Sequence, residues 1–341
     1  MKFIYYLLIS LIIIITGGTA FAQNTADVSL LIKQGVQLNN EGKYAEAIEI
    51  YNQALKIDTG NLYADYGLGF SLLNLNRGNE GIPYLNKVVK VNNKLTPWAY
   101  DLLGSIYDKN HESEKAIAAF NLGLKADPKY QRLYYNLGLV YFRDKQYSEA
   151  EKCAIESIKL DPKYANSQRM YALVTFHQNK RAAALMGFCS FILLEPNTVR
   201  SAEAFGNIGH ILQGGILKPA PGEKAPQAND ANTIALNQAI TQAVAETGKK
   251  KYASPADLLP AQLTAIFTAI GTLAEKQTGD DFFRKYYAAY FYQLAQSPNM
   301  HAFARLISSA ANKDEYAKWT ADHSKEVADL DSWVKTTGRG F

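Results

Sequence analysis

The chain has 341 residues, of which 48% are hydrophobic and 20% charged, a balance that is ordinary for a globular protein and excludes wholesale disorder. Its 36 basic and 32 acidic side chains give a net charge of +4, which is too small to indicate a nucleic acid partner. Cys153 and Cys189 are its two cysteines. Two are too few for a disulfide scaffold and these lack zinc-ligand spacing, so the fold must rest on packing.

The first 22 residues have the order of a secretory signal peptide. Lys2 is followed by an apolar run over residues 3–15 and then by the small-x-small site Ala20-Phe21-Ala22. An uncleaved membrane anchor is the alternative, but the run is shorter than the roughly 20 residues that a bilayer-spanning helix needs. We therefore expect cleavage between Ala22 and Gln23 and an exported protein, periplasmic or secreted, that is soluble and has no transmembrane segment after cleavage.

Small residues recur at a nearly constant period along the next part of the chain. The first set is separated by 34 or 35 positions: Gly35, Gly69, Gly104, Gly138, Ala172 and Gly206. A second small residue follows 12 positions after each of the first five: Ala47, Gly81, Ala116, Ala150 and Ala184. Apolar residues around them recur at helical spacing, so each unit is predicted to be a pair of helices with two close contacts. Asp127-Pro128, Asp161-Pro162 and Glu195-Pro196 mark the turns between units.

These residues resemble the tetratricopeptide repeat family, whose 34-residue unit carries W-x2-L-G-x2-Y, then A-x3-F and a closing proline. The third unit matches with Tyr100, Leu103, Gly104, Tyr107, Ala116, Phe120 and Pro128, and the fourth with Tyr134, Leu137, Gly138, Tyr141, Ala150 and Pro162. Thr59 and Thr175 depart from the consensus, and the second unit has one extra residue. The resemblance implies an all-α, right-handed superhelical solenoid of antiparallel helix pairs over residues 28–213, with about five repeats and a half repeat.

The period fails after residue 213. Residues 214–230 are rich in glycine and proline, which is typical of a linker or long loop. Helical signals return in residues 231–341, and we expect helices near 232–247, 255–277, 280–296, 298–310 and 313–336. Degenerate repeats and a helical cap over the last apolar face of the array both fit this region.

The chain shows no recognised catalytic chemistry. It contains no motif of serine hydrolases, zinc proteases or nucleotide-binding loops, and its five histidines are dispersed. His323 has carboxylates within one helical turn but too few other ligands for a metal site, so a solvated polar face is expected there. Cys153 and Cys189 are expected to be small buried side chains. We therefore predict that the protein is not an enzyme and has no catalytic residue, cofactor or metal.

Aromatic residues are concentrated between Phe282 and Tyr292 and spread around much of one predicted helix. Burial between neighbouring helices is the expectation, and an exposed surface for a partner or a glycan is the alternative. The run Lys249-Lys250-Lys251 lies between two predicted helices and is expected to be a solvated loop.

The resemblance also implies where a partner would bind. The first helices of the units line a concave groove, with groove-facing positions six and three residues before each marker residue and one and four after it. Aromatic and arginine side chains are enriched there, as they are at binding hot spots. Packing of several of them against a terminal helix is the alternative. The candidate groove residues are Tyr63, Tyr66, Phe70, Trp98, Asp101, Arg132, Tyr135, Phe142, Arg169 and Phe176.

We therefore expect a non-catalytic protein–protein interaction scaffold of the cell envelope, which binds a peptide or a partner helix in the groove. Chaperone C-terminal tails are disfavoured, because the basic and asparagine clamp that such repeats carry is missing from the first three units, where Ile32, Val36, Gly67, Trp98 and Leu102 stand instead. The alternative is an enzyme or glycan-binding module in residues 231–341, with the repeats recruiting partners.

Overall fold

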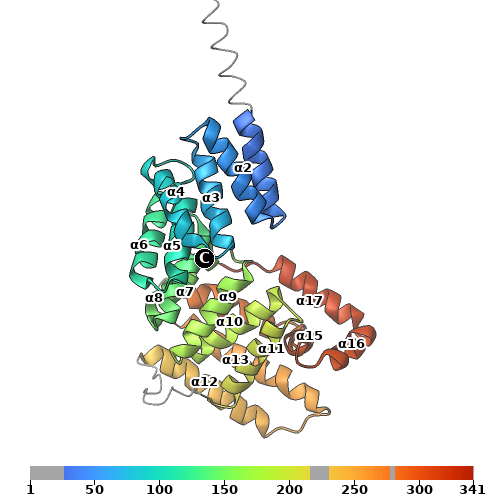
Figure 1. Cartoon of the computed structure of the whole chain (residues 1–341). Helices are drawn as coiled ribbons and strands as arrows, with labels where there is room; N and C mark the ends of the chain where they lie inside the picture. The colour runs from blue at the N-terminus through green and yellow to red at the C-terminus, as the bar shows by residue number, and fades with distance from the viewer. Residues whose placement is uncertain (1–26, 216–229, 277–280, 341) are drawn as a thin grey trace, which may run out of the picture. The chain divides into compact units, whose positions relative to one another are not determined.

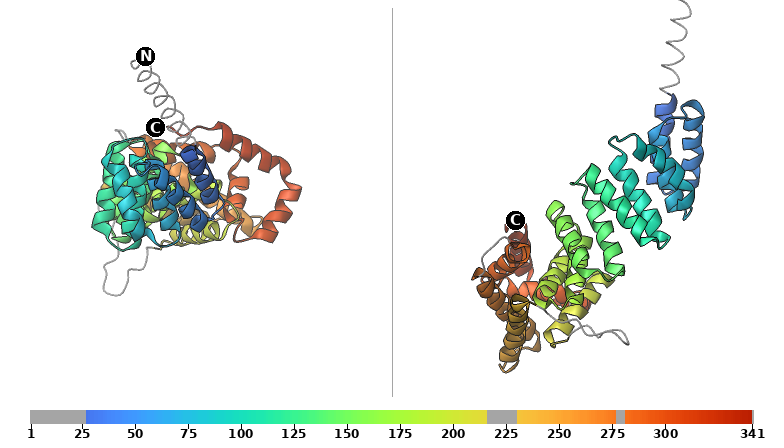
Figure 2. Two further views of the ribbon diagram at one scale, coloured as in Figure 1. Left: turned by 45° about the horizontal axis from the view of Figure 1, so that its top comes forward. Right: turned by 90° about the vertical axis from the view of Figure 1, so that its left-hand side faces the viewer.

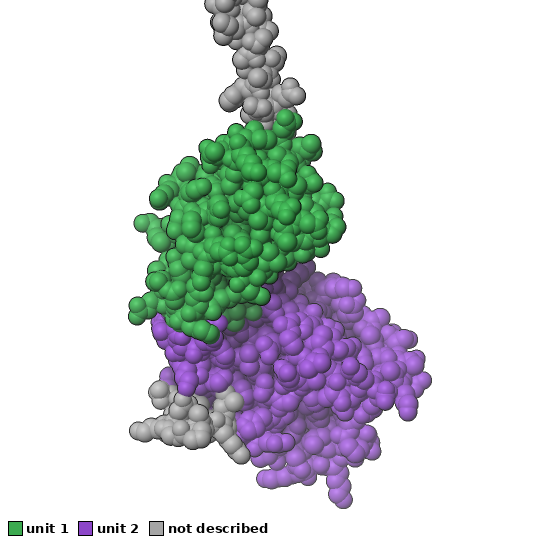
Figure 3. Space-filling model, in the orientation of Figure 1, with its two compact units in different colours: residues 1–140 green, residues 141–341 purple. Residues whose placement is uncertain are grey.

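The computed structural model describes residues 27–215, 230–276 and 281–340, and all secondary structure in those residues is helical. The chain divides into two compact units, residues 1–140 and 141–341 (Figure 3). The division falls within helix α7 (Gln131–Arg143). The expected signal peptide and most of the expected 214–230 linker lie outside the described residues.

Unit 1 is a stack of antiparallel helix pairs, which confirms the predicted fold class (Figures 1 and 2). The pairs are 27–40 with α2 (Tyr44–Ile57), α3 (Leu62–Asn74) with α4 (Gly78–Lys90), and α5 (Thr96–Lys109) with α6 (Ser113–Ala126), followed by the start of α7. Helix α4 packs on its own first helix α3 and on α5 of the next pair, α2 packs on α3, and α6 packs on α5.

In unit 1 the periodic small residues lie where the two helices of a pair touch. A Cβ atom placed on Gly81 in α4 would lie only 3.1 Å from the Cα of Gly69 in α3. A Cβ on Gly104 in α5 would lie 2.4 Å from the ring of Phe120 in α6. A side chain at either position would force the helices apart, so the small residues set how closely each pair packs.

The first helix of each pair ends in a residue with left-handed backbone geometry. The Glu112 N–H reaches back to the carbonyl of Tyr107 at 2.9 Å, and equivalent bonds close the other helices. This is a Schellman turn, in which a positive φ redirects the last carbonyls and makes room for the second helix. The residues at this position are Gly42, Asn76, His111, Lys145, Asn179 and Gly214.

His111→Gly is expected to raise the free energy of unfolding by about 1 kcal/mol, because glycine adopts a positive φ without the steric cost that a Cβ imposes. His111 has a φ of 60° and its side chain is exposed. Urea denaturation measures the change. His111→Ala is the control, since it removes the imidazole but keeps the Cβ, and it should give no gain. Equal stabilisation by both variants would contradict the role of backbone strain.

Unit 2 holds further helix pairs together with the C-terminal helices. After the end of α7, its elements are α8 (Tyr147–Leu160), α9 (Ala165–His177), α10 (Arg181–Leu194), α11 (Val199–Leu212), α12 (Ala231–Gly248), η1 (Pro255–Asp257), α13 (Leu258–Glu275), the π-helical η2 (Phe283–Ala288), α14 (Ala289–Ala295), α15 (Met300–Ser308), α16 (Lys313–Asp322) and α17 (Ser324–Thr336).

The expectation of one helix over 313–336 is wrong, because α16 and α17 are separated at His323. The imidazole of His323 stacks on the ring of Trp319, with centroids 4.7 Å apart, and its Nδ1 lies 2.9 Å from the Trp319 carbonyl oxygen. The same carbonyl accepts the backbone N–H of His323 at 3.0 Å, which is the last helical bond of α16.

Helix α10 forms the centre of unit 2. Every residue from Arg181 to Ile192 is buried, between α9, α11, α12, η2 and α15. The guanidinium of Arg181 donates a 2.8 Å hydrogen bond to the carbonyl of Ile211, and its backbone N–H donates to Asn237 in α12. The C-terminal helices therefore pack directly on the last repeats. Cys153 in α8 and Cys189 in α10 are buried and free, as predicted.

Four of the six aromatic residues of η2 and α14 are buried as expected, whereas Phe283 and Tyr292 are partly buried, so these two helices carry no fully exposed ring for glycan stacking. Tyr286, Tyr287, Tyr290 and Phe291 are each at most 2% exposed. Phe291 also packs on Phe267 of α13, with ring centroids 4.8 Å apart. Among the described helices, one stretch, Pro255–Glu275, is long and apolar enough to cross a membrane by length and composition. Its buried residues, Phe267 among them, belong to the core of unit 2.

Candidate partner-binding groove

A row of aromatic side chains lies on α3 and α5 of unit 1. Tyr63 is 44% exposed and Trp98 is 42% exposed, although both are large rings that usually gain from burial. Tyr66 and Phe70 are half-buried beside them, and the ring of Tyr66 lies 6.3 Å from that of Trp98. We call these four residues, Tyr63, Tyr66, Phe70 and Trp98, the aromatic face.

Two contacts hold the rings of the aromatic face in place. Phe70 meets Tyr44 of α2 edge to face, with centroids 6.2 Å apart. The ammonium of Lys94 lies 5.4 Å from the ring of Tyr63, within cation–π range. Burial raises the pKa of Tyr66 to about 12, so its hydroxyl remains protonated at neutral pH and can donate a hydrogen bond.

Asp101 and Arg132 form an ion pair in the same unit, with Arg132 Nε 3.0 Å from Asp101 Oδ2. Asp101 is only 2% exposed, and it also accepts hydrogen bonds from Asn136 at 2.7 Å and Tyr130 at 3.4 Å. Burial raises the pKa of Asp101, and the Arg132 guanidinium opposes that rise. Asp101 is therefore not a surface contact residue, as the sequence pattern suggested, but the group that orients the exposed Arg132.

Three residues occupy the same position in three successive repeats of unit 1: Tyr63, Trp98 and Arg132. They stand six residues before Gly69, Gly104 and Gly138, respectively. Each of these side chains is more than 40% exposed. Tyr135, three residues before Gly138, is half-buried in α7. The first helices of unit 1 thus present two aromatic rings and one guanidinium at the same repeat position. Tyrosine, tryptophan and arginine are the residue types most enriched at binding hot spots.

The predicted groove residues of unit 2 lie in internal contacts. Phe142 is half-buried against Tyr147 and His177, with ring centroids 5.7 and 5.2 Å away. Arg169 pairs with Glu203 of α11 at 3.3 Å. The expectation that Phe176 offers its ring to a partner is not met, because it is 2% exposed and packs on Phe188 and His210.

Helix α11 accounts for this difference between the two units. Asn166 and Arg169 of α9 contact Arg200 and Glu203 of α11, which stand 34 positions further along the chain. The Arg200 guanidinium donates to the side-chain carbonyl oxygen of Asn166 at 2.8 Å. Polar side chains at equivalent positions of neighbouring repeats therefore pair with each other in unit 2, whereas the positions of α3 and α5 equivalent to Asn166 carry the exposed rings of Tyr63 and Trp98.

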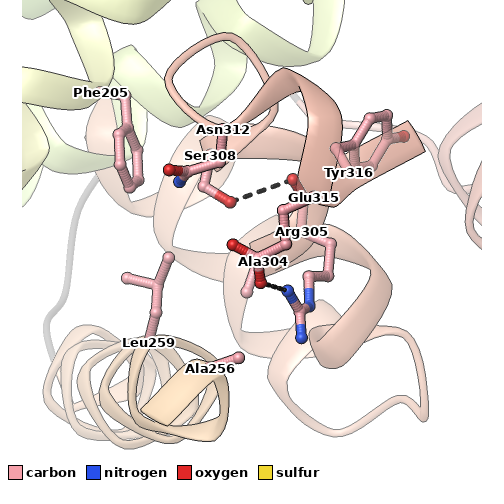
Figure 4. Close-up of a pocket in the computed structure, with 9 residues that line it drawn as sticks. All are labelled: Phe205, Ala256, Leu259, Ala304, Arg305, Ser308, Asn312, Glu315 and Tyr316. Carbon is pink, nitrogen blue, oxygen red and sulfur yellow. Dashed lines mark hydrogen bonds and ion pairs between the residues drawn. The ribbon is translucent and has the colours of Figure 1, made fainter. Parts of the chain in front are cut away.

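A pocket of about 150 Å³ lies in unit 2, between α11, α13, α15 and α16 (Figure 4). Its charged side chains already pair, Arg305 with Glu315, and the Ser308 hydroxyl donates to the carbonyl of Arg305 at 3.1 Å. Neither a histidine nor a cysteine is among its described lining residues. The lining residues are Phe205, Ala256, Leu259, Ala304, Arg305, Ser308, Asn312, Glu315 and Tyr316.

Three family models, all described as tetratricopeptide repeat, match the chain over residues 38–106, 99–130 and 132–164. The matched residues include the aromatic face and Arg132. Among curated proteins, no sequence matches the chain.

Solved structures with a similar fold include PilF of Pseudomonas aeruginosa, which is 16% identical, with 56% of this chain and 86% of PilF covered at a TM-score of 0.51. A thermophilic tetratricopeptide repeat protein of Thermus thermophilus is 21% identical, covering 52% of this chain and 98% of its own at a TM-score of 0.44. MamA of Desulfovibrio magneticus RS-1 is 20% identical, with 50% and 95% covered at a TM-score of 0.44. At these identities the likeness to PilF concerns the fold alone.

Proposed function

This chain belongs to the tetratricopeptide repeat family, whose members serve in general as non-catalytic scaffolds for protein interactions, and we propose that it binds a peptide or partner helix through the groove of unit 1. The observation that carries the proposal is the row of Tyr63, Trp98 and Arg132, exposed at one register position of three successive first helices. A merely solvated surface would favour lysine and glutamate at these positions.

The aromatic face suits a partner with apolar side chains at regular intervals. Rings on successive helices offer separate apolar contacts, and Arg132, oriented by Asp101, offers a donor pair for a carboxylate or a backbone carbonyl. Extended peptides and amphipathic helices both present anchors in this manner. The preformed rings lose little conformational freedom on binding, which favours affinity.

The double variant Tyr63→Ala with Trp98→Ala is expected to weaken partner binding by about 2 kcal/mol or more, as the loss of interface aromatics commonly does. Pull-downs from envelope extracts, followed by titration of the captured protein, measure the change. Leu122→Ala is the matched control, because Leu122 is a 46% exposed apolar residue on the second helix α6 of the same unit.

The control variant should retain every partner, and all three proteins should keep the same circular-dichroism spectrum and melting temperature, since the truncated side chains are partly exposed. Retention of every partner by the double variant would contradict the proposed groove. A drop in melting temperature for that variant alone would assign the two rings to the core.

We also propose that the scaffold acts outside the cytoplasm, on the strength of the signal-like order of residues 1–22. The mature chain is then expected to begin at Gln23. Intact-mass analysis of the protein purified from its native cells checks this expectation, and a species that retains residues 1–22 would contradict it.

A further inference from the structure

The C-terminal tail of unit 2 places Arg339 against a cluster of aromatic rings on η2 and α14. The guanidinium carbon of Arg339 lies 4.0 Å from the ring centre of Tyr290 and 5.0 Å from that of Tyr286. Phe291 and Tyr287 lie 5.6 and 5.9 Å away. All four distances are within cation–π range. We call these four residues, Tyr286, Tyr287, Tyr290 and Phe291, the arginine box.

The arginine box is a rigid, preformed structure. Its rings stand on the π-helical η2 and the following α14, and π-helical turns occur frequently at functional sites. The Tyr287 hydroxyl donates to the side-chain oxygen of Gln168 at 2.6 Å, and the Gln168 amide donates to the Tyr286 hydroxyl at 2.8 Å. Tyr290 packs on Trp333, with centroids 4.9 Å apart. The rings are therefore held by α9 and α17 and do not depend on the tail for their positions.

The chemistry of the box suits a guanidinium. Arg339 Nη1 donates a 2.8 Å hydrogen bond to the Ser190 hydroxyl. The guanidinium also hydrogen-bonds to the hydroxyls of Tyr286 and Tyr290, and the ring faces add cation–π attraction. No carboxylate of the described residues forms an ion pair with Arg339. A guanidinium is planar and weakly hydrated, so it gives up water for an aromatic environment more readily than an ammonium does.

The tail itself is held mainly through this one side chain. The last helical bond of α17 runs from the Thr337 N–H to the carbonyl of Trp333. Gly338 and Gly340 flank Arg339, and a Cβ at either glycine would have no neighbour within 4 Å. Glycine loses more backbone entropy on ordering than other residues, so a segment with glycine on both sides of its anchor gains backbone entropy on release. The tethered segment still keeps a high local concentration beside its site.

We propose that the arginine box is a guanidinium-binding site, occupied in this chain by its own Arg339, which also takes the arginine side chain of a partner peptide when the tail is displaced. This inference goes beyond the groove binding proposed above, because the box lies in unit 2 and the aromatic face lies in unit 1. The tail then acts as a competing internal ligand that lowers the affinity of the box for other arginines.

Binding of the tail sequence in trans tests the proposal. The probe is a fluorescent synthetic peptide with the sequence of residues 335–341, and its anisotropy is followed with the full chain and with the full-length Arg339→Ala variant. The variant is expected to bind the peptide at least about tenfold more tightly than the unchanged chain, because the box is no longer occupied in cis. A peptide with lysine in place of its arginine should bind the variant at least about threefold more weakly.

Two further variants locate the binding site. Arg339→Ala combined with Tyr290→Leu keeps an apolar side chain but removes the nearest ring face, and it should abolish detectable binding. Arg339→Ala combined with Ser190→Ala leaves every ring in place, loses only the hydrogen bond to Ser190, and should weaken binding by about threefold or more. It keeps the test decisive if the Tyr290 variant does not fold.

The proposal is overturned if the peptide binds the unchanged chain and Arg339→Ala equally, if arginine and lysine peptides bind alike, or if a folded Arg339→Ala variant binds neither. Unchanged binding in the folded Ser190 variant would also overturn it.

Discussion

Gly104→Leu is expected to lower the free energy of unfolding by about 2–3 kcal/mol, the upper part of the range for overpacked cores. An added Cβ already lies 2.4 Å from Cε1 of Phe120, and the longer leucine side chain extends further into the same space. Phe120 is 1% exposed, so its ring has no solvent to move into. Relief requires separation of α5 from α6, which also disturbs the neighbouring pairs.

Gly206→Leu is the matched control, because Gly206 stands at the same position of the repeat period. There, no atom lies within 4 Å of an added Cβ, and the residue is exposed on α11. The substitution is expected to raise the free energy of unfolding by about 0.5–1 kcal/mol through the better helix propensity of leucine. Urea denaturation followed by circular dichroism measures both variants. Equal destabilisation by the two would contradict the role of helix contact.

Tyr287→Ala is expected to lower the free energy of unfolding by about 3–5 kcal/mol, as removal of a fully buried aromatic ring generally does. The ring is 0% exposed and stacks on Tyr171 of α9, with centroids 4.9 Å apart. Its hydroxyl donates to Gln168, which is itself fully buried. The variant therefore leaves both a cavity and an acceptor without its donor, at the place where the C-terminal helices meet the repeats.

Tyr287→Phe separates the two contributions, since it keeps the ring and removes only the hydroxyl. It should lower the free energy of unfolding by about 1–3 kcal/mol, because the buried side chain of Gln168 loses its hydrogen-bond donor. Amide hydrogen exchange should show loss of protection in α9 and α10 as well as in η2 for Tyr287→Ala, because these helices share one core. Loss confined to η2 would contradict a common core for repeats and C-terminal helices.

The sequence allowed the helix pairs of the array to be predicted because their spacing leaves a local signature. Gly81 must be small since it meets the backbone of Gly69, and that requirement recurs at each pair. The left-handed turns are less visible, because His111 and Lys145 occupy positions that favour glycine or asparagine. Their repetition at the same period as Gly42 and Asn76 is the signal that could have revealed them.

The C-terminal region was harder to predict because its packing partners are distant in sequence. Helix α10 is apolar on all sides, with no charged residue between Arg181 and Glu195, a composition that indicates burial on every face. That pattern could have revealed that other helices cover α10. The hydrogen bonds between Gln168 and the two tyrosines of η2 join residues more than 110 positions apart, and no local pattern predicts them.

The sequence predicted which repeat positions the candidate groove residues occupy, but it did not predict which of their side chains are exposed. Tyr63, Trp98 and Arg132 are exposed where the repeat position places them. Asp101 and Phe176 occupy equally valid groove positions, yet residues on the first helix of the next repeat cover them. Arg132 and Asn136 of α7 cover the carboxylate, and His210 of α11 packs on the ring. Register fixes the direction of a side chain, whereas its exposure depends on the residue one repeat later.

Both thiols of the folded chain are buried, which slows their reaction with oxidants. Burial raises the pKa of Cys153 to about 12 and also raises the pKa of Cys189. Since the thiolate is the reactive form, almost none is present at neutral pH while unit 2 is closed. A chain with this arrangement can pass through an oxidising environment without forming mixed disulfides or cross-linked dimers. Once α8 or α10 opens, the same sulfurs become ordinary nucleophiles, so their alkylation rate reports how often unit 2 opens.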